Sequence, residues 1–77
     1  MSLLYNLKSG DLATISGINT ATAEQSLYQR LMALGFRVGK KIKVMRKASF
    51  NGPLQVRIGS TDIILRESEA KLIQISH

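Results

Sequence analysis

The sequence predicts a small, mainly β protein: a strongly bent barrel of five short strands, with a helix between the first and second strands. Apolar and polar residues alternate with period two in several short segments, and turn signals separate these segments. One longer segment has helical spacing instead. A barrel also removes the sheet edges that a chain rich in Ile and Leu must protect. A flat three-stranded sheet with a docked helix is the alternative architecture.

The first strand is predicted over residues 12–18, between turn or bulge points at Gly10 and Gly17. A helix should then begin at Thr22, whose hydroxyl can cap free backbone amides, while Gln25 can reach back in a capping box. The helix is predicted to be amphipathic because its apolar residues recur at spacings of four and three. They are Leu27, Leu31 and Leu34, with Tyr28 and Met32 beside them.

Gly35 should end this helix, because the residue after the last turn often takes a positive φ that glycine tolerates. The next residue, Phe36, has two interpretations. It can fold back onto Leu31 as part of the helix stop, or the segment can present Phe36 or Met32 as an apolar anchor at the centre of an interface. Complete burial of Phe36 would exclude the anchor.

The second half of the chain reads as strands and tight turns. From Lys40 the period is two, which predicts a half-buried strand with an outer row formed by Lys41, Lys43, Met45 and Lys47. Asn51-Gly52 is a hairpin signal, and Pro53 is admissible as the first residue of the following strand. Further strands are predicted over residues 54–58, 61–65 and 72–75, with a single helical turn at residues 68–70.

Length and composition limit the class of protein. We expect a single domain over residues 1–77, because half this length could not bury enough apolar surface. The absence of cysteine excludes thiol catalysis, thiolate metal sites and a disulfide framework. No export signal or long apolar stretch is evident, so we expect a cytoplasmic protein. The net charge of +6 is concentrated in residues 25–61, which hold eight Lys or Arg and no acid.

No residue pattern indicates catalysis, a cofactor or a metal. The single histidine, His77, is the last residue, where terminal mobility would spoil the geometry of a general base. Asp62, Glu67 and Glu69 lie close together in sequence, but they match no calcium loop, and solvated acids around a turn explain them. No phosphate-binding glycine loop is present. We therefore expect a protein that is not an enzyme and has neither cofactor nor resident metal.

Several short motifs, in order, resemble the FeoA family, the small cytoplasmic proteins of bacterial ferrous iron transport. The matching residues are Leu4, Leu7 and Gly10; Arg30-Leu31, Leu34-Gly35-Phe36, Gly39, Ile42 and Val44; Ala48 and Pro53; Leu65-Arg66 and Glu69-Ala70. The resemblance covers nearly the whole chain. It departs from the family in one loop, where Ser49 replaces the usual proline and Asn51-Gly52 replace the usual Gly-Asp.

The resemblance implies an SH3-like barrel with a helix inserted after the first strand. It also implies an accessory or regulatory role in ferrous iron uptake, through contact with FeoB, the membrane transporter that carries a cytoplasmic GTPase domain. Arg30 and Arg66 belong to the matching motifs, and each can instead anchor a carboxylate or carbonyl within the fold.

The basic segment has three interpretations. Outward lysines on an edge strand prevent aggregation and need no ligand. A basic face can dock on an acidic patch of the FeoB-like transporter and lie at the anionic inner leaflet of the membrane. A small basic barrel can also bind RNA or DNA, although between Arg37 and Arg57 only Phe50 is available for stacking. Homodimerisation through a sheet edge stays open. The candidate partner-binding residues are Lys40, Lys41, Lys43, Arg46, Lys47, Met32 and Phe36.

Overall fold

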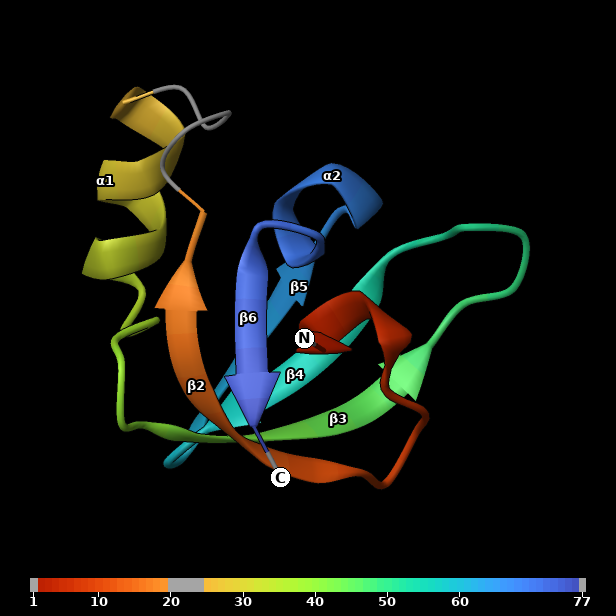
Figure 1. Cartoon of the computed structure of the whole chain (residues 1–77). Helices are drawn as coiled ribbons and strands as arrows, with labels where there is room; N and C mark the ends of the chain where they lie inside the picture. Colours follow the sequence, from red (N-terminus) through yellow and green to blue (C-terminus); the bar gives the residue numbers. More distant parts are fainter. Residues whose placement is uncertain (1, 20–24, 77) are drawn as a thin grey trace.

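The computed structural model describes residues 2–19 and 25–76, and these residues form a six-stranded antiparallel sheet with two short helices (Figure 1). The elements are β1 (Ser2–Leu3), the 3-10 turn η1 (Leu4–Asn6), β2 (Leu12–Ile18), α1 (Gln25–Ala33), β3 (Lys41–Lys47), β4 (Leu54–Ile58), β5 (Thr61–Leu65), α2 (Glu67–Ala70) and β6 (Ile73–Ser76). The strand order is β1-β6-β2-β3-β4-β5. The predicted mainly β class is confirmed.

Most of the predicted elements are present, and β2, β4 and β5 have the predicted bounds. The sixth strand is β1, which pairs with β6 so that Ser2 lies opposite Ile75. Two residues are too few to show an alternating pattern, which is why the sequence predicts only five strands. The predicted helix start at Thr22 lies outside the described residues, as does His77.

The sheet curls around one apolar core, to which every strand after β1 contributes buried side chains. The largest fully buried residues are Phe36, Leu4, Ile15, Leu31, Ile42, Leu54, Leu65, Ile73, Val44 and Val56. The end strands β1 and β5 are not hydrogen-bonded to each other, so the barrel stays open at this seam. The short helix α2 contacts both β5 and η1 there. Among the described residues, no helix has the length and apolarity needed to span a bilayer.

The predicted end of α1 is confirmed in detail. Gly35 has a φ of 102°, and its amide donates to the Met32 carbonyl at 3.1 Å. The amide of Phe36 donates to the Leu31 carbonyl at 3.0 Å. This pair of bonds is the Schellman arrangement, which satisfies carbonyls left free at a helix end. The Phe36 and Leu31 side chains are both fully buried, so the helix stop also packs the core.

β3 contains a bulge that the alternating sequence pattern does not show. Val44 and Arg46 pair with consecutive residues of β4, so Met45 is an extra residue on β3. The alternation shifts after Met45: Arg46 is exposed, while Lys47 lies opposite the buried Leu54. The predicted outer row is therefore wrong in its second half. The observed outer row consists of Lys41, Lys43 and Arg46.

The turn between β3 and β4 lies one residue earlier than Asn51-Gly52 predicts. Phe50 and Asn51 are the two residues with positive φ, at 58° and 61°. The amide of Gly52 donates to the carbonyl three residues earlier at 3.2 Å, so Gly52 ends the turn. A Cβ at Gly52 would lie 2.7 Å from the Ala48 Cβ, which means that this glycine serves close packing. Pro53 precedes β4 and does not belong to it.

Candidate functional site

Three exposed cations, Lys41, Lys43 and Arg46, share the outward side of β3. We call this surface, together with the outward side chains of β2, β4 and β5 beside it, the outer basic face. The sheet register places Lys43 between Leu12 of β2 and Arg57 of β4. Among the described residues, neither lysine nor Arg46 forms an ion pair, so all three charges are available to a partner.

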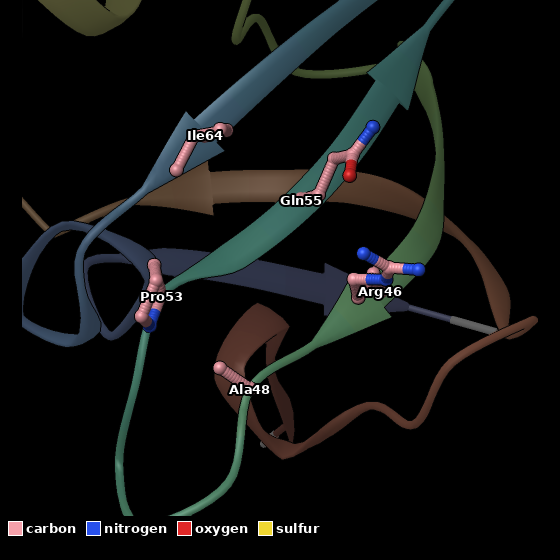
Figure 2. Close-up of a pocket in the computed structure, with 5 residues that line it drawn as sticks. All are labelled: Arg46, Ala48, Pro53, Gln55 and Ile64. Carbon is pink, nitrogen blue, oxygen red and sulfur yellow. The ribbon is translucent and has the colours of Figure 1, made fainter.

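Exposed apolar side chains lie beside these cations. Leu12 is 66% exposed and Ile64 is 64% exposed, so each presents a large apolar group to solvent. One shallow groove runs past Leu12 and is lined by Lys41, Lys43 and Arg57. Figure 2 shows a second groove, between the end of β3 and the two strands that follow. It is lined by Arg46, Ala48, Pro53, Gln55 and Ile64.

The fourth cation of the face, Arg57, is neutralised within the sheet. Its Nε donates to Oδ1 of Asp62 at 2.6 Å, and its terminal Nη2 donates to Oδ2 at 3.1 Å. This hydrogen-bonded pair lowers the pKa of the Asp62 carboxyl and raises the pKa of the Arg57 guanidinium. The charge that a partner meets on the outer basic face therefore comes from β3.

The Arg57–Asp62 pair makes a specific pH prediction. Because the pKa of Asp62 is lower in the folded chain than in the unfolded chain, its contribution to stability is complete above the unfolded value, about 3.9. That contribution is lost as the pH falls through the folded value. We expect D62N to lower the free energy of unfolding at neutral pH and to have a smaller effect near pH ~2, as measured by urea denaturation. An undiminished difference at low pH would contradict this role of the charge.

Lys47 is held by the fold and does not join the outer basic face. Its Nζ donates to the Tyr5 carbonyl at 2.5 Å and to the Leu7 carbonyl at 3.4 Å, and it lies 4.4 Å from the centroid of the Tyr5 ring. The bulge at Met45 shifts the alternation of β3, so the Lys47 side chain points toward Tyr5 and not toward the outer basic face. Burial, and then the nearby Glu67 carboxylate, raise the pKa of Tyr5. The Tyr5 hydroxyl donates to the Gly52 carbonyl at 3.3 Å.

The remaining predicted site residues lie outside strand β3. Phe36 is fully buried, which excludes the apolar anchor that its position after the helix allows. Met32 is half-buried on α1, which lies apart from β3 and β4 (Figure 1). Lys40 is exposed just before β3, and its backbone amide donates to the Arg37 carbonyl at 3.1 Å. Lys41, Lys43 and Arg46 are thus the predicted residues that the structure brings together.

The motif residue Arg30 has a partner within the fold. Its guanidinium donates to the carboxylate of Glu69, which is only 5% exposed. The other oxygen of Glu69 accepts from the backbone amide of Arg66 at 2.8 Å and caps α2. This buried carboxylate ties α1 to α2, which supports a structural role for Arg30. Arg66 contributes its backbone to the same cluster.

The described residues contain no cluster of three or more acidic, histidine or cysteine side chains placed to hold a metal ion. Every buried side-chain nitrogen or oxygen in this part of the chain has a hydrogen-bond partner. The outer basic face is therefore the strongest candidate site in the described part of the chain, and its chemistry is that of a surface that binds anions or acidic macromolecules.

Comparison with known proteins decides the family. Residues 3–77 match the model of the FeoA domain. The chain belongs to the FeoA domain family. It is 33% identical over 73 residues to a Campylobacter jejuni protein named "Putative Fe(2+) transport protein A", and the match covers 95% of both chains. FeoA is a family of accessory proteins of ferrous iron transport, as the sequence resemblance implies.

Solved structures of FeoA proteins share this fold. A Stenotrophomonas maltophilia FeoA, solved as a zinc complex and described as a prokaryotic SH3 domain protein, has a TM-score of 0.87 and 28% identity, covering 99% of this chain and 91% of its own. A Chlorobium tepidum FeoA has a TM-score of 0.83 and 34% identity, covering 96% of this chain and 68% of its own. The predicted SH3-like barrel is thereby confirmed for this FeoA-family chain.

Two residues of the face escape the sequence prediction, although a signal for each exists. Leu12 alternates with the inward Ala13, so its outward position follows from the period of the strand. Ile63 and Ile64 are adjacent in β5, so one of them must face outward. Both outward residues are apolar, and single exposed apolar residues are common enough that neither indicates a site by itself.

Proposed function

We propose that this FeoA-family protein is a non-enzymatic accessory protein of ferrous iron uptake that binds the cytoplasmic domain of a FeoB-like transporter through the outer basic face. The observation that supports this proposal is the set of unpaired charges on β3. Lys41, Lys43 and Arg46 are exposed on one side of a rigid sheet, with exposed apolar groups beside them. A central row of cations flanked by exposed apolar groups is suited to an acidic protein patch that also carries apolar contacts.

The charge distribution also supports a location at the cytoplasmic face of the membrane. A net charge of +6 on 77 residues attracts the protein to the anionic inner leaflet, where each nearby Lys or Arg contributes about 1 kcal/mol. The transporter's cytoplasmic domain lies at the same surface, so the two attractions act together. Steering of this kind raises the association rate more than it lowers the dissociation rate.

The test is capture by the transporter's purified cytoplasmic domain. We expect K41E/K43E/R46E to reduce capture by about tenfold or more at physiological salt, because three attractive contacts become repulsive. The matched control is K8E/R37E/R66E, which reverses three exposed cations away from β3 and lowers the net charge equally. Lys47 is left unchanged because its substitution would disturb the fold through Tyr5.

Two outcomes would contradict the proposal. If the face variant and the control lose capture equally, net charge and not this face controls binding. If both are captured like the unaltered protein, the face is not the docking surface. Binding to RNA or DNA stays a prediction: a salt-sensitive mobility shift with sequence preference, abolished by the face variant, would replace the transporter as the partner.

A further inference from the structure

The loop between β3 and β4 extends away from the rest of the molecule (Figure 1). At its tip, the side chain of Phe50 is 102% exposed, so no part of the ring is covered by the protein. Exposed large apolar residues elsewhere in the described chain, such as Val38 at 68%, are partly covered. A single exposed apolar residue does not indicate a site by itself, but a completely exposed aromatic ring gains the most from any contact that covers it.

The β3–β4 loop that carries Phe50 is held in place by hydrogen bonds. The amide of Ala48 donates to the Pro53 carbonyl at 3.0 Å and closes the base of the loop. The Tyr5 hydroxyl donates to the Gly52 carbonyl at 3.3 Å and holds the loop to the barrel. Phe50 itself has a φ of 58°, a conformation that a bulky residue adopts only at a cost. An observed backbone outlier that presents an exposed ring is a reason to look for a function.

The chemistry around the tip favours a lipid surface over a protein groove. The neighbours of Phe50 are Ser49, Asn51 and Gly52, which are too small to surround an interface hot spot. No acid occurs between residues 25 and 61, and the exposed Arg46 lies just before the loop. A single convex aromatic at the tip of a loop, with an exposed cation, Arg46, at the base of the loop and no carboxylate in this segment, matches the anionic headgroup boundary, which needs no complementary shape.

We propose that Phe50 inserts into the headgroup region of an anionic phospholipid bilayer and that the β3–β4 loop thereby anchors one end of the barrel to the membrane. This inference rests on the proposed location at the inner leaflet. It extends the proposed function by naming Phe50 as the contact and anionic phospholipid as the ligand. Arg46 of the outer basic face lines a groove together with Ala48 and Pro53 at the base of the loop. An anchored loop therefore holds the outer basic face next to the bilayer, and Lys41 and Lys43 stay available to the transporter.

The chain offers a clean reporter because it contains no tryptophan. F50W places the only indole at the tip. Added to vesicles of phosphatidylcholine and phosphatidylglycerol, F50W should show a blue-shifted emission and quenching by brominated lipid. Vesicles of phosphatidylcholine alone should give neither. The control V38W places the indole at an exposed position before β3, whereas Phe50 follows β3, and its emission should not shift.

A second pair of measurements separates contact from structure. F50S should lower vesicle binding in a sedimentation assay by roughly tenfold, because the variant loses the free energy gained when part of one aromatic ring is buried in lipid. F50G should lower vesicle binding similarly while its melting temperature stays equal to or above that of the unaltered protein, because glycine relieves the positive φ. A ring with a structural role would instead lower the melting temperature when removed.

Three results would overturn the lipid anchor. The first is that the unaltered protein fails to bind anionic vesicles, and the second is that F50S binds them like the unaltered protein. The third is that F50W emission shifts with the transporter's cytoplasmic domain but not with vesicles, which would make Phe50 a protein contact. The vesicle assays contain no transporter and the capture assay contains no lipid, so the two proposals can fail separately.

Discussion

Replacing Phe36 with alanine is expected to lower the free energy of unfolding by about 3–5 kcal/mol, because the ring is fully buried and its removal leaves a cavity. A domain of this size has a total stability near the low end of ~5–15 kcal/mol, so F36A should lose most of it. Urea denaturation followed by circular dichroism measures the loss. The ring also packs with Leu31 at the Schellman stop of α1, so the helix should melt with the sheet.

V38A is the matched control for F36A. Val38 lies two residues further along the same loop but is 68% exposed, and its truncation should change stability by less than about 0.5 kcal/mol. The account would be contradicted if F36A kept its stability but was no longer captured by the transporter domain. Phe36 would then be an exposed interface anchor in the free protein and not a core residue.

The second large effect is expected at Glu69, which is buried and joins two helices. E69A removes the acceptor for the Arg66 amide and for the Arg30 guanidinium, and it leaves the start of α2 uncapped. Loss of a helix cap costs about 1 kcal/mol, and loss of a charged hydrogen bond costs about 1.5–3 kcal/mol. We expect a total of about 2–3 kcal/mol in urea denaturation, because the half-exposed Arg30 regains water.

The same helix supplies the control for E69A. Glu67 is two residues earlier, and its partly exposed carboxylate lies 3.7 Å from the Lys71 ammonium in an i,i+4 pair and also acts on the Tyr5 hydroxyl. Such pairs are worth about 0.2–0.5 kcal/mol, and Tyr5 keeps its hydrogen bond to the Gly52 carbonyl, so E67A should have a smaller effect than E69A. Equal effects of E67A and E69A would show that the buried link between α1 and α2 is not what stabilises this end of the barrel.

Much of the fold could be predicted because local patterns and tertiary packing agree. The alternation in β2, β4 and β5 gives their bounds, and Gly35 gives the end of α1. The bulge at Met45 could not be predicted, because an extra residue in a strand depends on what its neighbour strand presents. The earlier turn at Phe50 has a similar cause: close packing of Gly52 against Ala48 overrides the local preference of Asn51-Gly52.

The outward residues of β3 could be predicted from the sequence only as far as the bulge at Met45. Lys41 and Lys43 precede the bulge, and their outward positions follow from the period. Lys47 follows the bulge, so the same period places it on the wrong side, and Arg46 takes its place in the outer row. Whether Phe36 is exposed or buried depends on the core that it meets, which no local pattern contains.

The most direct test of the central claim is the affinity of the protein for the transporter's purified cytoplasmic domain, titrated over a range of salt concentrations. If the charges of Lys41, Lys43 and Arg46 carry the contact, affinity should fall steeply as the Debye length shrinks from about 30 Å at 0.01 M to about 8 Å at 0.15 M. K41E/K43E/R46E should bind weakly at every salt concentration, without this steep decline. Equal affinities and equal salt dependence for the unaltered protein and the variant would contradict the account.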